Sequence, residues 1–545
     1  MFVSRNFLKL SFQSVIFHAR TIITSKYENI SYKKETIAEH VFTFCDKYSN
    51  NIAFIDDVRK TSYTYSDVKG LVSSIASALT KRGVKQGTMA GIISTNSPEY
   101  VMLIYALSSM GCSVTICNQN FTSREIINQL SDSQPSIIFT NKECLSKVTN
   151  VISELSTVKN IYLIGDPLPG YETVDKLMAD SGNMNPIGQI NLDLDSHIAL
   201  MPYSSGTTGL PKGVMLTHNN LVANFRQINK AHEISDVKKM LIALPLYHIY
   251  SQVIIISMGF FSGSQMVFQS KFEPTNYLRA IEQYKISVLH LVPPQILFLL
   301  NNHETKNFNL TSIEKCFSAA APLDAVVENR FIETFREHQP NFDTFQGYGL
   351  SETSPLTHIM PNIKIPGKQG SVGLLVSDME CKIIDNFSRK EVFANESGEI
   401  LLKGPNIMKG YFGKSAETEK AFEDGWFKTG DIGHYDDDHY FYISDRIKEL
   451  IKVKGFQVAP AELEGVLLSI PGVVDCAVIG VPDERCGEVP KAFVVQNQNL
   501  SENQIHEYIN SHLSSYKQLK GGIIFVNEIP KSPSGKILRM LLRQK

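Results

Sequence analysis

Apolar and polar positions follow regular patterns along the chain from about residue 35 onward. The segment Thr64–Gly83, TYSDVKGLVSSIASALTKRG, places apolar residues three and four positions apart and ends at a glycine, which predicts an amphipathic helix. Short β-rich runs follow at Met89–Ser94, Ser136–Thr140 and Asn160–Gly165. Because strands that alternate with helices build layered α/β structures, we expect a largely parallel sheet in this part of the chain.

A second β-rich zone runs from about Gly367 to Tyr442 and is dense in Gly and Asp turns. After it, IKVKGFQVAPAELEGVLLSIPGVVDCAVIGVPD has the pattern of strand, turn, helix and strand. We therefore predict an α/β protein with a domain boundary near Asp445–Lys448. Residues 28–445 would form a large N-terminal domain of layered α/β subdomains plus a β-rich subdomain, and residues 446–545 a small mobile α+β domain.

Length and composition narrow the class of protein. A chain of 545 residues is too long for one compact core, and its 43% hydrophobic and 20% charged residues are ordinary for a globular protein. The net charge of -2 gives no reason to expect nucleic acid or an anionic membrane as a partner. The longest apolar run, Val253–Phe261, falls short of the roughly 18 residues of a spanning helix. Eight scattered cysteines without a CxxC pair indicate a reducing compartment and no structural zinc.

The first 27 residues differ from the rest of the chain. They contain no acidic residue before Glu28, and serine and bulky apolar residues separate the basic ones. This composition is typical of a mitochondrial presequence, which we predict for residues 1–27. The alternative is a merely basic, disordered N-terminus on a cytoplasmic or peroxisomal protein, although the C-terminal LLRQK is not an SKL-type peroxisomal signal.

The segment SSGTTGLPKG, Ser204–Gly213, has the composition of a loop that binds phosphate. Glycines let backbone N–H groups turn toward an anion, hydroxyl groups add donors, and a lysine adds a compact positive charge. It is not the P-loop motif GxxxxGK[ST], because Gly213 follows the lysine. A flexible surface loop is the alternative. The candidate phosphate ligands are Ser204, Ser205, Gly206, Thr207, Thr208 and Lys212.

Four further motifs follow this loop in order. They are QGYGLSETSP (Gln346–Pro355), GWFKTGDIG (Gly425–Gly433), SDRIKELIKVKGFQVAPAELE (Ser444–Glu464) and PKSPSGKILR (Pro530–Arg539). Together the five motifs resemble the core motifs of the adenylate-forming family, which contains acyl-CoA synthetases, 4-coumarate–CoA ligases and beetle luciferases. The resemblance extends from about residue 35 to residue 545. It implies that a carboxylic acid attacks the α-phosphate of ATP, pyrophosphate leaves, and a thiol captures the acyl-adenylate.

The resemblance also assigns nucleotide-binding roles. Glu352 would bind one Mg²⁺, and Asp431 would accept hydrogen bonds from the ribose hydroxyls with Arg446 nearby. Lys536 would bridge the carboxylate and the α-phosphate, where cations must neutralise the charge that develops between two anions. Read without the family, these residues would be a capping carboxylate, a turn former and a solvated lysine. The backbone of Gln346, Gly347 and Tyr348 would line the adenine slot, and Ser351 would lie near the α-phosphate.

A second set of residues matches the family's thioester-forming geometry. Lys454 and Gly455 match a loop that lines the pantetheine tunnel, and Lys271 matches a cation at the CoA phosphates. Lys452 and Gln457 match residues that contact the nucleotide in that geometry, and Lys448 matches the family's hinge. The alternative is an ordinary charged strand edge, where lysine is common.

The acyl pocket is assigned by the same resemblance. His248 in ALPLYHIYSQ matches a histidine that faces the substrate carboxylate, and the HIY triplet with Tyr250 resembles the coumarate ligases. Ala319, Ala320 and Ala321 stand where relatives often have one or two glycines, so their methyl groups would narrow one wall. An apolar pocket gains roughly 0.8 kcal/mol per buried CH₂. That preference alone does not distinguish an aryl-propenoic acid from a medium- or long-chain fatty acid.

Three classes of function remain open on this basis. The first is an AMP-forming acyl-CoA synthetase that uses ATP, Mg²⁺, CoA and an apolar acid. The second is a luciferase-like oxidoreductase, against which Asn224 stands where beetle luciferases carry an arginine. The third is a non-catalytic nucleotide- or acyl-binding protein, in which Lys536, Glu352 or Asp431 would be lost, and all three are present. The sequence does not indicate an oligomeric state.

Overall fold

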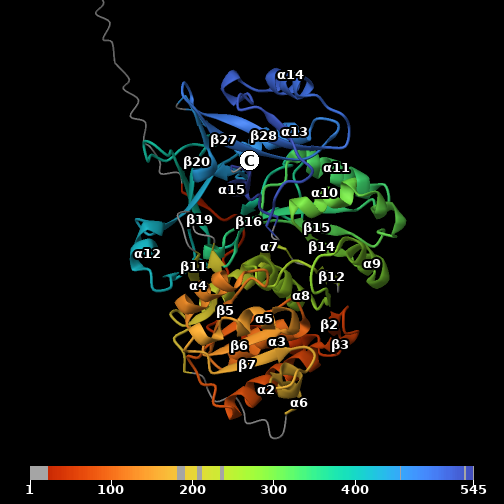
Figure 1. The fold of residues 1–545 in the computed structure, drawn as a ribbon. Helices are drawn as coiled ribbons and strands as arrows, with labels where there is room; N and C mark the ends of the chain where they lie inside the picture. The colour runs from red at the N-terminus through yellow and green to blue at the C-terminus, as the bar shows by residue number, and fades with distance from the viewer. Residues whose placement is uncertain are drawn as a thin grey trace, which may run out of the picture.

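A computed structural model describes residues 22–180, 191–204, 211–232, 238–454, 456–532 and 535–543. In Figure 1 a large body, coloured red through cyan, carries a smaller C-terminal unit coloured blue. The body holds two sheets of nine strands and one of six, and the C-terminal unit holds a sheet of five. This arrangement confirms the predicted α/β class with a small second domain.

The first nine-stranded sheet is parallel from β9 to β8 and ends in an antiparallel hairpin. Its order is β10 (Tyr203–Ser204), β11 (Lys212–Thr217), β9 (Ile198–Met201), β5 (Ser113–Ile116), β4 (Met89–Ile93), β6 (Ile137–Asn141), β7 (Asn160–Ile164) and β8 (Glu172–Thr173), with β21 (Gly410–Tyr411) beside β11. The associated helices are α2 (Tyr65–Lys81), α3 (Pro98–Ser109), α4 (Ser123–Ser133), α5 (Lys142–Thr149), η1 (Ile152–Glu154) and α6 (Val174–Ala179).

Both faces of this sheet are covered, which explains why its strands are almost wholly apolar. Ile92 and Phe139 belong to a core that includes residues of α2, α3 and α6, whereas Ile93 and Ile138 belong to one formed with α4 and α5. This alternation is the two-residue period of a strand. The predicted helix at Thr64–Gly83 is confirmed as α2, which Thr64 caps.

The second nine-stranded sheet is parallel from β16 to β2, with antiparallel strands at both edges. Its order is β18 (Leu374–Leu375), β17 (Leu356–Ile359), β16 (Asp343–Gly349), β15 (Lys315–Ser318), β14 (Val288–Leu291), β12 (Lys239–Ile242), β13 (Gln265–Phe268), β2 (Ile52–Asp56) and β3 (Thr61–Thr64). Its helices are α1 (Ile37–Lys47), α7 (His218–Ala231), η2 (Tyr250–Ile255), α8 (Ile256–Ser262), α9 (Pro274–Tyr284), α10 (Pro293–Asn301), η3 (His303–Asn307), α11 (Ala325–Arg336) and η4 (Ser351–Thr353). As in the first sheet, two separate cores lie on its two faces.

The β-rich zone forms the antiparallel six-stranded sheet. Its strands are β1 (Ile23–Thr24), β19 (Glu380–Ile384), β20 (Gly398–Lys403), β23 (Trp426–Tyr435), β22 (Phe422–Glu423) and β24 (Phe441–Arg446), with α12 (Ser415–Ala421) before β22. Among the described helices, none is long and apolar enough to cross a bilayer.

The C-terminal unit has its own hydrophobic core, as expected for a separate domain. It contains η5 (Ile447–Glu449), β25 (Ile451–Val453), β26 (Phe456–Val458), α13 (Pro460–Leu468), β27 (Val473–Asp483), β28 (Gly487–Gln496), α14 (Glu502–His512), η6 (Ser515–Lys517), β29 (Ile523–Phe525) and α15 (Arg539–Leu542). Figure 1 shows it above β16, α10 and α11, with α15 near the junction.

Two predicted boundaries shift by a few residues. Strand β1 pairs with β19, and the Lys26 ammonium donates to the Asp438 carbonyl at 2.8 Å, so the end of the predicted presequence 1–27 is part of the N-terminal domain. Arg446, predicted to start the C-terminal domain, is the last residue of β24 and pairs with Asp431 of β23. The C-terminal sheet begins only at Ile451, which places the connection in η5.

Candidate active site

A cavity of about 2140 Å³ opens where the two domains meet. Side chains from both domains line it, including most residues that the motifs singled out. Those present in its lining are Ser204, Lys212, His248, Tyr250, Ala319, Ala320, Ala321, Gly347, Tyr348, Ser351, Glu352, Asp431, Arg446, Lys448, Gln457 and Lys536. Segments up to 423 residues apart in sequence, from Ile116 to Arg539, therefore contribute to one cavity.

The candidate phosphate loop connects the two strands of a hairpin. Ser204 pairs with Lys212 across β10 and β11. Lys212, the predicted positive charge of the loop, is therefore the first residue of strand β11. The Ser204 hydroxyl is buried and has no hydrogen-bond partner among the described residues. Ser205, Gly206, Thr207 and Thr208 lie outside the described residues.

Asp431 is held by two neighbours on the wall of the cavity. The Tyr348 hydroxyl donates to its Oδ2 at 2.6 Å, and the Arg446 Nε lies 3.3 Å from its Oδ1. Burial raises the pKa of Asp431, while Arg446 and the Tyr348 hydrogen bond act in the opposite direction. The carboxylate is thus fixed in orientation at the place where the motifs predict the ribose.

Gln346 lies behind this wall instead of on it. Its side-chain amide nitrogen donates to Glu328 at 2.9 Å and to the Leu323 carbonyl at 3.1 Å. Its backbone carbonyl accepts the backbone N–H of Met360. Of the three residues predicted for the adenine slot, Gly347 and Tyr348 line the cavity, whereas Gln346 does not. Its side chain instead ties β16 to the segment that follows Ala321.

Glu352 lies in the short turn η4 and is 8% exposed. The Tyr411 hydroxyl donates to its Oε1 at 3.0 Å. Tyr411 was not among the predicted residues, because it lies outside the quoted motifs and reaches the site only through the pairing of β21 with β11. Among the described residues, no group of three or more His, Cys, Asp or Glu forms a metal cluster.

Lys536 lies close to two carboxylates and two other cations. Burial is the main cause that lowers the pKa of Lys536 to about 8, and Arg446 and Lys448 act in the same direction. Asp431 and Glu352 favour its charged form. The C-terminal domain thus places an ammonium group among the N-terminal residues that the motifs assign to ATP.

His248 faces the same cavity and is neutral. Burial, followed by the charge of Lys536, lowers the pKa of His248 to about 3. Its Nδ1 accepts the backbone N–H of Tyr250 at 3.3 Å, so the proton of the neutral ring resides on Nε2. His248 can therefore donate a hydrogen bond from Nε2.

The acyl end of the cavity is mostly apolar. Tyr250 contributes a buried hydroxyl, which lies 3.3 Å from His290 Nδ1 and donates to the Phe317 carbonyl at 3.4 Å. Ala320 has φ of 74°, a left-handed conformation that favours glycine. The Ala320 methyl group on this wall therefore belongs to a residue whose backbone conformation is strained for any residue other than glycine.

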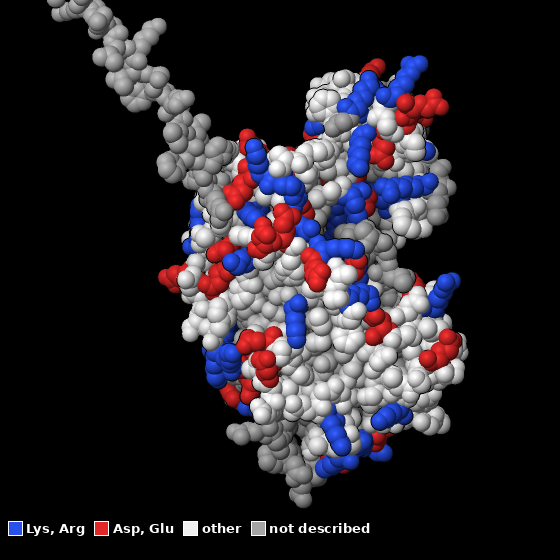
Figure 2. Space-filling view, turned by 90° about the vertical axis from the view of Figure 1, so that its left-hand side faces the viewer, with Lys and Arg blue, Asp and Glu red and all other residues white. Residues whose placement is uncertain are grey.

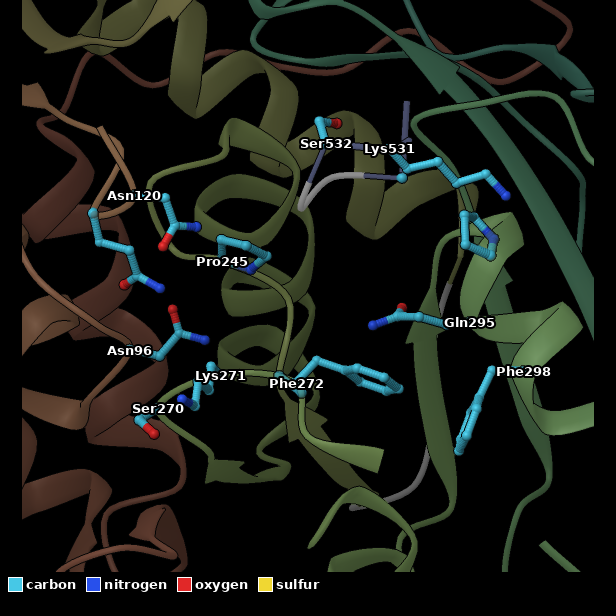
Figure 3. A pocket seen from close by; sticks show the side chains of 14 residues that line it. Asn96, Asn120, Pro245, Ser270, Lys271, Phe272, Gln295, Phe298, Lys531 and Ser532 are labelled. Carbon is cyan, nitrogen blue, oxygen red and sulfur yellow. The ribbon is translucent and has the colours of Figure 1, made fainter. Parts of the chain in front are cut away.

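The residues predicted for CoA do not line the main cavity. Lys271 lines an adjoining pocket of about 400 Å³, which shares Lys531, Ser532 and Gly535 of the C-terminal domain with the main cavity. Figure 3 shows Lys531 and Ser532 at one side of this pocket, with Asn96, Ser270 and Lys271 opposite. Lys452 and Lys454 are exposed on or beside β25 and line neither cavity, and Gly455 lies outside the described residues.

Comparisons with known proteins agree with this site. The family model described as AMP-binding enzyme matches residues 41–412, and the AMP-binding enzyme C-terminal domain matches residues 462–536. The chain is 38% identical to a 4-coumarate–CoA ligase of Vanilla planifolia, with 96% of each chain covered. It is 34% identical to a probable 4-coumarate–CoA ligase of Dictyostelium discoideum, with 96% of this chain and 98% of the relative covered. The chain therefore belongs to the AMP-binding enzyme family.

Solved structures show the same architecture. The ATP-bound MatB of Rhodopseudomonas palustris aligns with a TM-score of 0.82 at 26% identity and covers 93% of this chain and 98% of its own. The o-succinylbenzoate CoA synthetase of Bacillus subtilis, solved with its acyl-adenylate, aligns with a TM-score of 0.78 at 27% identity and covers 94% and 99%. The prediction of an enzyme that uses ATP for acid–CoA ligation is confirmed. On the face in Figure 2, acidic and basic side chains lie interspersed, in keeping with small-molecule partners.

The lowered pKa of Lys536 predicts a pH dependence for adenylation. The lysine acts as a cation, so its contribution is present below its folded pKa of about 8 and is lost as the pH rises through that value. We expect kcat/KM for acid-dependent ATP–pyrophosphate exchange to decline above about pH 8. Lys536→Arg keeps its charge at this pH and should show a lower rate with a flatter profile. A wild-type profile that stays level from pH 7 to pH 9.5 would contradict this assignment.

Proposed function

We propose that the cavity between the domains adenylates an apolar carboxylic acid and that CoA then captures the acyl group. The observation that carries this proposal is the convergence of Lys536, Asp431, Glu352 and His248 on one cavity. Two of these groups are the hydrogen-bond donors that a carboxylate needs, and two are acceptors suited to ribose and a hydrated cation.

Charge is the main obstacle to the first step. The substrate carboxylate and the α-phosphate are both anions, and their approach requires fixed positive charge between them. Lys536 supplies this charge from a partly buried position, where its interactions are stronger than in bulk water. The Nε2–H of His248 is placed to hold one carboxylate oxygen without adding a second full charge. The other oxygen is then free to attack phosphorus.

Glu352 fits a magnesium site. Its Oε1 accepts from Tyr411, and no described donor pairs with its Oε2 on the cavity wall. Magnesium in nucleotide enzymes is commonly held by one or two carboxylates together with phosphates and waters, so a three-carboxylate cluster is not required. The bound ion would neutralise phosphate charge, and Tyr411 would keep the Glu352 carboxylate oriented.

Thioester formation requires a different arrangement of the C-terminal domain. In the proposed adenylation geometry Lys536 would lie beside the reacting carboxyl group, and the flanking residues Lys531, Ser532 and Gly535 line the pocket that contains Lys271. A thiol that enters past Lys271 would meet this segment. Rotation about η5, which contains Lys448, would withdraw it and bring Lys452, Lys454 and Gly455 toward the cavity.

The acid is proposed only as a class. Relatives named 4-coumarate–CoA ligase favour an aryl-propenoic acid. A Mycobacterium tuberculosis fatty acyl CoA synthetase at 25% identity, with a TM-score of 0.72, keeps a fatty acid and a role in lipid metabolism as the second possibility. The apolar wall at Ala319–Ala321 suits either, so a panel of aryl-propenoic and C6–C16 fatty acids should be assayed for ATP- and CoA-dependent thioester formation. Turnover of no member above background would contradict the proposal.

Separation of the two half-reactions tests the role of Lys536. Lys536→Ala should lower acyl-adenylate formation by about 100-fold or more, because the charge between the two anions is lost. It should still convert supplied acyl-adenylate and CoA to thioester within about threefold of wild type. Lys520→Ala, an exposed lysine of the same domain, serves as the control and should leave both rates unchanged. Equal loss of both half-reactions in a folded Lys536→Ala protein would show that the lysine does not act in adenylation alone.

We also propose a mitochondrial location, based on the basic, acid-free composition of the N-terminal segment. Because strand β1 starts at Ile23, a cleavage that spares the fold would fall before this residue. Residues 1–22 fused to a fluorescent protein should direct it to mitochondria. A variant with Arg5, Lys9 and Arg20 changed to Glu should remain in the cytosol. A diffuse signal from the unaltered fusion would contradict the proposal.

A further inference from the structure

Lys212, which the sequence predicts as a phosphate ligand in the nucleotide site, already has a carboxylate partner. Its Nζ lies 2.5 Å from Oε2 of Glu417 in α12, and 5.0 Å from the centre of the Tyr411 ring. The lysine side chain is 12% exposed and that of Glu417 is 33% exposed. Both residues line the main cavity. The contact therefore joins a cation of the site to an acidic residue outside the five motifs.

The fold fixes this contact from both sides. Strand β21 pairs with β11 through Val214 and Tyr411, and the Phe412 N–H donates to the Gly213 carbonyl at 2.8 Å. The Tyr411 N–H donates to the Thr418 hydroxyl at 2.9 Å, which holds the start of α12 against β21. These hydrogen bonds therefore hold Lys212 and Glu417 within reach of each other.

Electrostatics keeps Glu417 ionised. Its hydrogen bond with Lys212 is the main cause that lowers the pKa of Glu417, and a second one with Lys420, 3.3 Å away, adds to it. An ionised carboxylate at this position satisfies the lysine and repels phosphate oxygens that approach it. While Lys212 is paired with Glu417, its ammonium attracts a phosphate less strongly than an unpaired lysine would.

We propose that Glu417 is a positioning residue that serves as the internal counter-ion of Lys212 in the nucleotide-free enzyme. The pyrophosphate end of ATP displaces it, and it takes Lys212 back when pyrophosphate leaves. This inference rests on the proposed adenylation reaction, and it concerns the binding of ATP and the release of pyrophosphate. Glu417 makes no contact with the reacting carboxyl group in this account, so it alters affinity and leaves the chemical step unchanged.

Loss of the negative charge should tighten the binding of both phosphate compounds. A partly exposed ion pair is weak, and its removal corresponds to about a 1.4- to fivefold change in affinity. Glu417→Gln should lower KM for ATP and Ki for pyrophosphate by this factor, with kcat within twofold of wild type. The effect should shrink when the ionic strength is raised from about 0.05 M to 0.5 M, because salt screens exposed charges.

The test measures acid-dependent ATP–pyrophosphate exchange in the full chain with Glu417→Gln, Glu417→Ala and Glu419→Gln. Glu419 lies exposed on the same helix and makes no ion pair among the described residues. Glu419→Gln removes one negative charge from α12, as Glu417→Gln does, and should behave as wild type. The inference is wrong if both Glu417 variants fold, as judged by their melting temperatures, and leave KM and Ki unchanged or raised while wild type exchanges. It is also wrong if Glu419→Gln has the same effect. A wild type without acid-dependent exchange would instead overturn the proposed function itself.

Discussion

The repulsion between a carboxylate and a triphosphate is the constraint on which this structure depends. Lys536 comes from the C-terminal domain and lies beside Arg446, Asp431 and Glu352, in surroundings that lower the pKa of Lys536 to about 8. The domain interface is therefore part of the site. In the reaction that we propose, the cavity is complete for adenylation only while the domains are in contact in this way.

The rest of the fold serves to bring the other groups to that interface. Parallel strands in both large sheets end on the same side, as is usual for ligand sites in α/β proteins. Strand β23 presents Asp431 from the six-stranded sheet, and β16 leads into the turn that carries Glu352. The hairpin β10–β11 holds both ends of the predicted phosphate loop, and β21 and α12 add Tyr411 and Glu417 from a distant part of the sequence. In the account proposed above, the Glu417 carboxylate pairs with the Lys212 ammonium while the cavity holds no nucleotide.

The sequence predicted what local patterns encode. Helix α2 and the parallel strands β4, β6 and β7 lie within one or two residues of their predicted ranges, because their apolar periods and caps are local signals. Strand β11 was missed, since a run of six residues after a glycine-rich loop carries no clear period. Tyr411 and Glu417 were missed because only the pairing of β21 with β11 brings them to the site. Motifs predicted the principal site residues, but Gln346 faces away from the cavity, which a motif alone does not specify.

The central claim is that this domain arrangement performs adenylation and must change before thioester formation. The N-terminus of α11 and helix α13 meet at Asp324 and Gly465, where a Cβ placed on Gly465 would lie 3.9 Å from the Asp324 Cβ. This spacing suits a disulfide, and seven of the eight native cysteines are buried. Oxidised Asp324→Cys/Gly465→Cys protein should form acyl-adenylate at near the rate of the reduced protein, yet make thioester at least tenfold more slowly until a reductant is added. Thioester formation at the same rate in the oxidised and reduced forms would contradict the account.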